Sequence, residues 1–422
     1  VKAGSLKKKK QVHSGGKKGT AGRTSKTKNK KRIMSPMKFC VLTAWVSFSP
    51  FLCAGFHQQM PSPFNQQHEF RGGLQALSMS VEGKSVLGLG SCGVDFVATV
   101  DKYPEADAKI RSTSFNVFGG GNVGNTLTCL SRLSVDARLV TKVGTDSNGG
   151  VILSGLEEEG VDTTRCLKSP DTDSAFTYVI VDPSSATRTC IHTPQKEEMK
   201  PEEITQSLLE GVDIVHLDSR HTPAAIKLAE LAREKGVLIT LDAEKDRPHF
   251  KELLPLCDIL ICNSKFPTIW TGCEDRLEAM AQILSSNDNA KMIISTIGEE
   301  GSIMVCKPSE LEDTFLKIPT AAADSPLKVS TEVYLSEEIS SSYEVFRCPA
   351  WPVEKSEIVD TTGAGDSFIG GVIFGVLSKM PAYQLLILAS YIAAQKLKQP
   401  GARTGIPRLD QIPDSLLSSS IQ

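Results

Sequence analysis

The amino-acid sequence predicts an α/β protein with a mostly parallel central sheet and helices on both faces of that sheet. In the second half of the chain, strand-like runs alternate with helical patterns, as in residues 212–218, 222–236 and 237–243. This alternation is typical of β-α-β crossovers, which join parallel strands. The strand-like run 257–263 is apolar over most of its length, as expected for a strand that is buried on both faces. With 422 residues and 40% hydrophobic side chains, the chain can also bury a large core.

Each element is predicted from the period of its apolar residues. A period of two or a short apolar run indicates a strand, and a period near 3.6 indicates a helix. Residues 95–104, for example, alternate like a half-exposed strand and end at Pro104. On these grounds we expect strands at 85–90, 95–104, 137–144, 175–182, 187–193, 212–218, 237–243, 257–263, 290–298 and 344–349, and helices at 121–133, 148–160, 222–236, 274–286, 364–380 and 382–397.

Residues 320–343 interrupt this alternation. The segment is rich in Ser, Ala and Glu and has no clear apolar period. Such a composition is typical of an insertion on the surface, so we expect a mobile loop here.

The charge of the chain is divided between two regions. Residues 1–68 contain 14 Lys and Arg side chains and no Asp or Glu, which leaves 33 basic and 49 acidic side chains, a net charge of −16, for residues 69–422. An acidic body disfavours nonspecific binding of nucleic acid. Residues 1–36 have few apolar side chains, so we expect a disordered basic head. It is either a solvated tail without catalytic consequence or a tail that meets RNA, the nucleus or a membrane surface.

Residues 37–80 have the composition of a targeting segment followed by a linker. Their apolar run, 39–56, is 18 residues long and is interrupted by two serines and a proline, which makes it marginal for a membrane span. A signal-peptide core, an organelle transit peptide and an anchor all stay open. Because the chain begins with Val, we expect the natural start of translation at Met34 or Met37, with the head as upstream or added sequence.

The cysteines favour a reducing compartment. The chain has 11 of them, an odd number, without a C-x-x-C pair or a spacing typical of zinc sites. We therefore expect an intracellular protein, in an organelle such as the plastid or in the cytoplasm. The body has no other long apolar run, so no stable membrane span is expected there.

Two familiar phosphate-binding patterns are excluded. Gly88, Gly90 and Gly93 match G-x-G-x-x-G after a strand-like run. A dinucleotide-binding fold would need a helix next, and a strand-like pattern follows instead. No G-x-x-x-x-G-K-[ST] sequence occurs, so a Walker-type loop is absent.

The stretch VDTTGAGDSFIGG, residues 359–371, carries the chemistry that these patterns lack. Gly363, Ala364 and Gly365 offer successive backbone N–H groups at the start of a helix, where the helix dipole attracts anions. Asp366 follows directly, and a carboxylate beside a phosphate suits a base that accepts a proton from an attacking hydroxyl. The alternative is that Asp366 simply caps the helix.

The longer string DTTGAGDSFIGG resembles the C-terminal signature of the ribokinase-like (pfkB) carbohydrate kinase family. The resemblance covers roughly residues 84–409 in family order and includes three further positions or motifs. It implies a three-layer α/β/α sandwich with a small β lid in a kinase domain at 84–415, lid strands near 96–116 and 174–193, and the use of ATP and Mg²⁺. The further matches are Asp95 in GVDFV, then Gly120, Gly121 and Asn125 in GGGNVGNT, and Thr296, Gly298 and Gly301 in STIGEEG.

The resemblance also implies roles for single residues. Asp366 is similar to the catalytic base, and Gly363, Ala364 and Gly365 to the anion hole. Asp95 and Asn125 would hold substrate hydroxyls, with Gly120 and Gly121 allowing close approach of the backbone. Thr296, Gly298, Gly301 and Asn263 would lie along the nucleotide. Gly401, Ala402 and Thr404 resemble a loop that closes over adenine and holds a monovalent cation such as K⁺ in many members.

One position departs from the family pattern. The family often has N-x-x-E near the phosphates, where Glu organises Mg²⁺ through water, whereas here Phe266 stands three residues after Asn263. A Phe cannot bind a cation through oxygen, so either Glu299 or Glu300 substitutes or metal handling is altered. Asp242 stands where the family often has an acidic strand end. The metal ligands are therefore unknown from the sequence.

Three histidines have competing interpretations. His216 lies within an apolar run and is expected in the core. His192 ends a lid strand, where it could contact substrate. His221 follows a strand end and could cap the next helix.

The leading hypothesis is an ATP-dependent kinase that phosphorylates a hydroxyl of a small sugar or related polyol. Alternatives are a nucleoside kinase of the same fold and a non-catalytic, kinase-like regulatory or binding protein, which the loss of the family Glu favours. Lid strands with an exposed edge often pair between subunits, so a homodimer through the lid is a further expectation.

Overall fold

The computed structural model describes residues 81–185, 187–308, 327–336 and 338–417. All of these belong to one of the two units of the chain, Pro61–Gln422. The expected basic head at 1–36 and the targeting-like segment at 37–80 lie outside the described residues. Within the described part, no helix has the length and apolar character needed to cross a bilayer.

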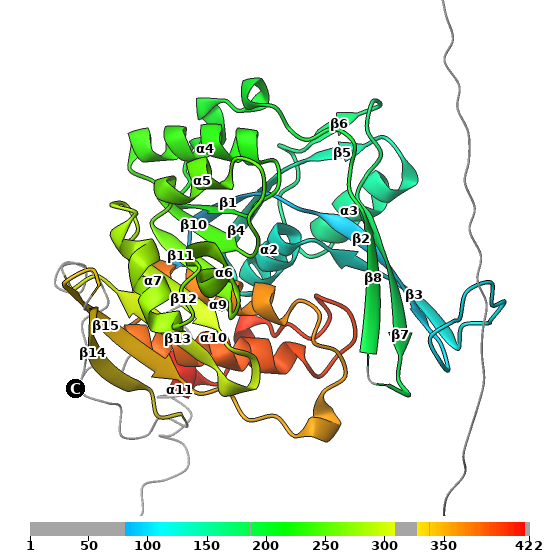
Figure 1. Cartoon of the computed structure of the whole chain (residues 1–422). Helices are drawn as coiled ribbons and strands as arrows, with labels where there is room; N and C mark the ends of the chain where they lie inside the picture. The colour runs from blue at the N-terminus through cyan, green and yellow to red at the C-terminus, as the bar shows by residue number, and fades with distance from the viewer. Residues whose placement is uncertain (1–80, 186, 309–326, 337, 418–422) are drawn as a thin grey trace, which may run out of the picture. The chain divides into compact units, whose positions relative to one another are not determined.

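A large, mostly parallel sheet forms the centre of the fold (Figure 1). Among the described residues it has nine strands, in the order β14-β15-β13-β12-β11-β10-β9-β1-β4. The strands from β12 to β4 run parallel, and β13, β15 and β14 extend one edge in antiparallel fashion. Their bounds are β1 Ser85–Leu89, β4 Asp136–Val140, β9 Ile214–Leu217, β10 Leu238–Ala243, β11 Ile259–Asn263, β12 Met292–Thr296, β13 Ser302–Cys306, β14 Ser330–Ser336 and β15 Ser341–Cys348.

Helices cover both faces of this sheet, which confirms the predicted three-layer α/β/α class. Successive strand residues serve opposite faces: Val86 packs in the cluster that contains α2, α9 and α10, whereas Leu87 packs in the cluster of α4 and α7. The helices are α2 Asn122–Arg132, α3 Ser147–Glu157, α4 Thr222–Lys235, α5 Phe250–Leu253, α6 Phe266–Thr271, α7 Arg276–Ser285, α9 Ala364–Leu377, α10 Ala382–Lys396 and α11 Asp414–Leu417.

Two glycines allow helix α9 to pack closely against α2 and α10. A Cβ atom at Gly370 would lie 2.6 Å from the Cβ of Cys129 in α2. A Cβ atom at Gly371 would lie 2.7 Å from the Cα of Ala389 in α10. The small residues after the signature string thus fix the position of the helix whose first turn carries Asp366.

A second sheet of four strands, β3-β2-β7-β8, forms the lid (Figure 1). Its two faces differ because side chains alternate along each strand. Asp95 lies opposite Thr177, which lies opposite His192, and these residues line the pocket. The region expected to hold lid strands at 96–116 contains most of β2 and the start of β3, separated by residues 100–113. The bounds are β2 Gly93–Thr99, β3 Ser114–Gly120, β7 Phe176–Asp182 and β8 Thr187–Thr193.

The expectation of a mobile loop at 320–343 is wrong for the part that the structure describes. Ser330–Ser336 is strand β14, which pairs with β15 along its whole length. Most of its side chains are exposed, so a polar composition is compatible with an edge strand. Residues 320–326 lie outside the described residues.

The expected strand at 137–144 is divided in two. The chain leaves the central sheet at Thr141, and β5 (Lys142–Gly144) pairs instead with β6 (Leu167–Ser169). The local sequence of residues 137–144 does not reveal such a change of partner.

Candidate active site

A pocket of about 710 Å³ lies under the lid, at the carboxyl ends of the parallel strands. The loops after β1 and β9, the end of β10 and the first turn of α9 all contribute to its wall. Ligands bind at this edge of open α/β sheets because the strand ends and helix starts meet there. The volume is within the usual range for a small-molecule site.

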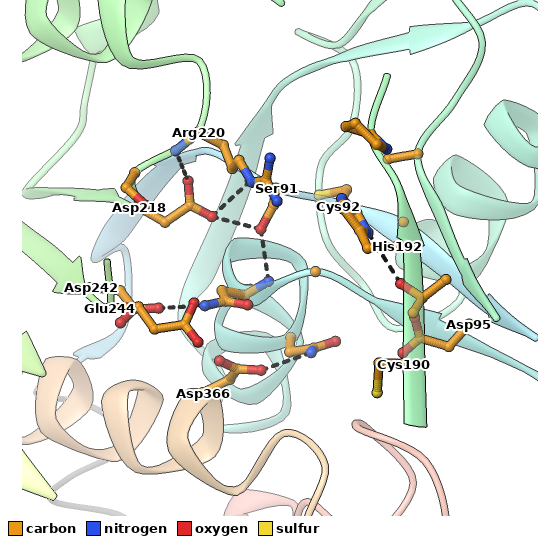
Figure 2. Close-up of a pocket in the computed structure, with 18 of the residues that line it drawn as sticks. Ser91, Cys92, Asp95, Cys190, His192, Asp218, Arg220, Asp242, Glu244 and Asp366 are labelled. Carbon is orange, nitrogen blue, oxygen red and sulfur yellow. Dashed lines mark hydrogen bonds between the residues drawn. The ribbon is translucent and has the colours of Figure 1, made fainter. Parts of the chain in front are cut away.

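The structure brings Asp366, Asp95 and Asn125 to this one pocket, as the sequence predicts. Asp366 is the third residue of α9, and its Oδ2 accepts a hydrogen bond from Nδ2 of Asn125 at 2.8 Å. Figure 2 shows Asp366 and Asp95 reaching the pocket from different elements, the α9 start and lid strand β2. The carboxylate of Asp366 is therefore held at the pocket wall and does not cap its own helix, since no side-chain cap is formed there.

Burial raises the pKa of Asp366 to about 7. The nearby carboxylates of Glu244 and Asp218 raise this pKa further, whereas the Asn125 hydrogen bond and the positive charge of Arg403 lower it. A base works best when its pKa lies near the working pH. The environment of Asp366 thus suits a group that accepts and releases a proton near neutrality.

The loop at residues 360–365, here called the signature loop, presents fewer free backbone N–H groups than the sequence predicts. Gly363 adopts φ 75° just before α9, and Gly365 lines the pocket. Within the described residues, the N–H groups of Gly363 and Gly365 have no acceptor. Ala364 differs: its N–H donates to the Thr361 carbonyl at 3.3 Å, and the residue does not line the pocket.

A second loop, residues 399–402, packs against the signature loop. Asp360 accepts hydrogen bonds from the Thr362 N–H at 2.8 Å and from the Gly401 N–H at 2.9 Å, which ties residues 360–363 to residues 399–402. A Cβ atom at Gly363 would lie 2.5 Å from the carbonyl oxygen of Ala402. Gly401 and Ala402 therefore contact the loop of residues 360–363, although neither lines the pocket.

The ammonium group of Lys396 binds between these two loops. Its Nζ donates to the Asp360 carbonyl at 2.8 Å and to the Gln399 carbonyl at 3.2 Å, and the residue is 0% exposed. The sequence predicts that Gly401, Ala402 and Thr404 help to hold K⁺. In the structure, the Lys396 ammonium group already supplies a positive charge at this loop. No separate monovalent site follows from the geometry.

Replacing Lys396 by Met is expected to destabilise the protein by about 1–3 kcal/mol, because two partly buried carbonyl groups lose the donor that Lys396 supplies. Lys398→Met is the matched control, since that side chain is 33% exposed and pairs with Glu357 at 3.0 Å. A surface ion pair contributes about 0–1 kcal/mol. Urea unfolding of both variants measures the difference, and equal stabilities would contradict a supporting role for Lys396.

The glycines of the N-terminal motif bring the backbone close to Asp95. A Cβ atom at Gly120 would lie 2.6 Å from Oδ2 of Asp95. Gly121 has φ 90°, and a Cβ there would lie 2.5 Å from Cα of Cys92. Burial raises the pKa of Asp95, and the Thr177 hydrogen bond and Arg403 oppose this rise. His192, expected as a possible substrate contact, lines the same pocket.

The predicted nucleotide residues lie outside this pocket. Thr296, Gly298 and Gly301 are at the end of β12 and the turn that follows it. Oδ1 of Asn263 accepts from the Phe266 N–H at 3.0 Å, so this side chain shapes the start of α6. Whether any of the four meets a nucleotide stays a prediction.

Phe266 fills an apolar position and not a cation site. Its ring stacks on Trp270 and meets Phe250 edge-on. Glu299 and Glu300 are exposed and lie outside the pocket, so the geometry does not make them substitutes for the missing Glu.

Sequence reasoning missed several charged residues of the pocket. All but one of them follow the carboxyl ends of β9 and β10, and residues at these strand ends could have been proposed as pocket residues from the sequence. Asp218 accepts from the N–H and Oγ of Ser91 at 2.9 and 2.6 Å (Figure 2). Asp242, noted as an acidic strand end, accepts from Asn122 at 2.7 Å. The charged residues missed are Asp218, Arg220, Glu244, Lys245 and Arg247, together with Arg188 from the lid.

Of the two remaining histidines, His216 lies in the core, whereas His221 is buried and also lines the pocket. His216 is fully buried, as expected, with Nδ1 at 3.0 Å from the Thr240 hydroxyl. His221 does occupy the position before α4, but its side chain makes no cap and instead accepts from the Met199 N–H at 3.2 Å. Burial lowers the pKa of both imidazoles, to about 3 and about 4.

The described residues offer no ready metal cage. Nowhere in this part of the chain do three or more His, Cys, Asp or Glu side chains form a group that could hold a metal ion. Mg²⁺ often binds chiefly through substrate phosphates and water, and we assign it no protein ligand.

The comparisons with known proteins identify the family to which this fold and pocket belong. The family described as "pfkB family carbohydrate kinase" matches residues 84–327 and 333–409, so the chain belongs to the pfkB family of carbohydrate kinases. An ATP-dependent ribose-1-phosphate kinase of Halopiger xanaduensis is 26% identical over 330 residues, which cover 78% of this chain and 96% of the relative.

Two solved structures share the fold. Ribokinase from Thermotoga maritima is 20% identical, with a TM-score of 0.60, and the match covers 79% of this chain and 99% of that one. Arabidopsis thaliana ribokinase complexed with ribose and ATP is 19% identical, with a TM-score of 0.62, covering 80% and 99% of the two chains.

Proposed function

We propose that the protein transfers a phosphoryl group from ATP to a hydroxyl of a small sugar or related polyol. The observation that carries the proposal is the position of Asp366, beside free main-chain amides and in one pocket with Asp95. Membership of a carbohydrate kinase family and a relative named as an ATP-dependent sugar-phosphate kinase support it.

In this proposal the substrate hydroxyl lies between Asp95 and Asp366. Asp95 accepts a hydrogen bond from a second hydroxyl and so orients the sugar. Asp366 accepts the proton of the attacking substrate hydroxyl. The hydroxyl oxygen bonds to the γ-phosphorus while the bond between this phosphorus and the ADP oxygen breaks. The N–H groups of Gly363 and Gly365 stabilise the charge on the transferring group, a contribution of about 10²–10³ in rate for one such donor.

The proposed cofactors are ATP and Mg²⁺. A solved structure of the same fold is named as a complex with ATP, and another as a complex with ATP and Mg²⁺. Mg²⁺ would supply charge neutralisation at the phosphates. Because the Lys396 ammonium already binds the Asp360 and Gln399 carbonyls, the proposal includes no monovalent cation.

Release of ADP with Mg²⁺-ATP and a panel of acceptors tests the proposed function. The panel contains ribose, fructose, other ketohexoses, inositols, sugar phosphates and nucleosides. Turnover with a sugar or polyol is expected. Turnover with a nucleoside alone would favour the nucleoside-kinase alternative. Bound nucleotide without ADP release for any acceptor would favour the non-catalytic, regulatory alternative.

We also propose a homodimer formed through the outer face of the lid. Phe96 lies opposite Tyr178, which lies opposite Ile191, so these residues share the face that points away from Asp95. Large apolar side chains of the lid on that face are half exposed, and a second copy is the occupant that would bury them symmetrically. Sedimentation of the wild type against Tyr178→Asp tests this, and a wild-type monomer at micromolar concentration contradicts it. The exposed members are Phe115 (58%), Val117 (47%), Tyr178 (51%) and Ile191 (51%).

A further inference from the structure

A buried guanidinium group lies directly behind the proposed base. Arg403 is 8% exposed, and its Nε donates to Oδ1 of Asn125 at 2.9 Å. Its Nη2 donates to the Gly120 carbonyl at 3.0 Å. Arg403 therefore links the loop after α10 to the N-terminal glycine motif and, through Asn125, to Asp366.

The chemistry of the guanidinium fixes the orientation of the Asn125 amide. A guanidinium group only donates hydrogen bonds, so the amide atom that faces it must be the oxygen. The NH₂ group of Asn125 must then point the other way, toward Oδ2 of Asp366 at 2.8 Å. Without Arg403, the amide could turn its oxygen toward Asp366 whenever that carboxyl group is protonated and can itself donate.

The sequence makes room for this guanidinium with two glycines. A Cβ atom at Gly119 would lie 2.4 Å from Nη1 of Arg403, and one at Gly124 would lie 2.8 Å from Nη2. On the outer side, Nη1 of Arg132 donates to the Arg403 carbonyl at 2.8 Å, which holds the backbone of the loop. Arg403 is thus enclosed in a fitted site.

We propose that Arg403 is a positioning residue that fixes the Asn125 amide so that its N–H always faces the Asp366 carboxylate. This inference rests on the proposed function, because it assigns Asp366 the role of base. Arg403 acts through Asn125 and does not line the pocket itself. The sequence resemblance gave Asn125 a role toward substrate only, so its contact with the base adds a second role.

The charges around Asp366 predict the direction of the effect. The groups that face Asp366 from the neighbouring elements are the acids Glu244, Asp218 and Asp242, the thiol of Cys129, and the cations Arg403 and Lys396. The acids and burial raise the pKa of Asp366, and the Asn125 bond and Arg403 lower it. Loss of Arg403 removes one lowering effect, its positive charge, and frees the Asn125 amide whose hydrogen bond is the other, so the ionised, proton-accepting form of Asp366 appears only at higher pH.

Carbon-13 NMR titration of the Asp366 carboxyl group in the full chain tests the proposal without relying on turnover. The resonance is identified by its absence in Asp366→Asn. We expect Arg403→Gln to raise the titration midpoint by about one pH unit, the size typical for loss of one close opposite charge. Arg408→Gln removes the same charge from an exposed position of the same segment and should leave the midpoint unchanged.

Two further variants separate positioning from a merely structural role. Arg403→Lys keeps a donor-only cation, so its midpoint should lie between those of wild type and Arg403→Gln. It is also the variant to measure if Arg403→Gln does not fold. In an Asn125→Ala background, substitution of Arg403 should shift the midpoint clearly less than in wild type.

The outcomes are distinguishable from failure of the proposed function. A chain that turns over no acceptor but shows these shifts keeps the Arg403 proposal and loses the kinase assignment. A midpoint that stays unchanged in folded Arg403→Gln overturns the Arg403 proposal, and so does an Asn125→Ala background in which substitution of Arg403 shifts the midpoint as far as in wild type. If turnover is present, the acidic limb of the pH–rate profile should move with the NMR midpoint, whereas an equal loss of rate at every pH would indicate a structural role and overturn it as well.

Discussion

Replacing Asp366 by Asn is expected to lower kcat by about 10²–10⁴-fold, the usual contribution of a general base. The amide has nearly the same shape and still fits beside Asn125, but it cannot accept the proton of the substrate hydroxyl. KM for the acceptor should change little, since Asp95 and the lid remain. Steady-state kinetics on purified Asp366→Asn measures the effect.

The same substitution should not reduce stability, which separates loss of chemistry from loss of fold. The pKa of Asp366 is raised in the folded state, so stability falls as pH rises from the unfolded pKa to about 7. At pH 8 the wild type therefore carries an unfavourable buried charge that Asn removes. A Tm at pH 8 equal to or above that of wild type is expected. Asp410→Asn, at an exposed position, should change neither rate nor Tm, and near-wild-type turnover of Asp366→Asn would remove the base assignment.

Replacing Gly363 by Ala is expected to have the next largest effect, about 10²–10³ in kcat. Gly363 has φ 75°, and its new Cβ would lie 2.5 Å from the Ala402 carbonyl oxygen. Relief of this clash must move the signature loop, and with it the amides of Gly363 and Gly365. The left-handed backbone adds a stability cost of about 1–2 kcal/mol.

Gly365→Ala provides the matched control for stability. No heavy atom lies within 4 Å of a Cβ at Gly365, and the residue does not require positive φ. Its Tm should equal that of wild type, or rise slightly because Ala favours the first turn of a helix. Circular dichroism melts of both variants make the comparison, and equal Tm values would show that the Gly363 conformation is not constrained.

The fold class could be predicted because strand and helix periods alternate clearly from residue 84 onward. The lid strands 175–182 and 187–193 were also correct, since a Pro-Ser turn separates two alternating runs. Strand β14 was missed because an edge strand needs only one partner and can keep polar, exposed side chains. The change of sheet at Thr141 was missed because it depends on where the next partner lies, which no local pattern records.

The sequence could predict which main residues form the site, but not the hydrogen bonds that connect them. Asp366, Asp95 and Asn125 come from distant parts of the chain, and the family signature placed them in one pocket correctly. Arg403 was not singled out, because its role appears only when the loop after α10 folds against the N-terminal glycines. Asp218 and Glu244 were missed because an acid after a strand reads as an ordinary turn residue until the sheet order is known.

The pH dependence of kcat/KM for the acceptor, at saturating Mg²⁺-ATP, tests the role of Asp366 as base most directly. The structure predicts a tenfold fall per pH unit below about 7 and a plateau above it, because only the ionised carboxylate accepts the proton. The fall in kcat/KM below about pH 7, the acidic limb of the profile, should be absent from the residual activity of Asp366→Asn. A wild-type profile that stays level from pH 5.5 to 8.5, or a limb that persists in Asp366→Asn, would contradict the assignment.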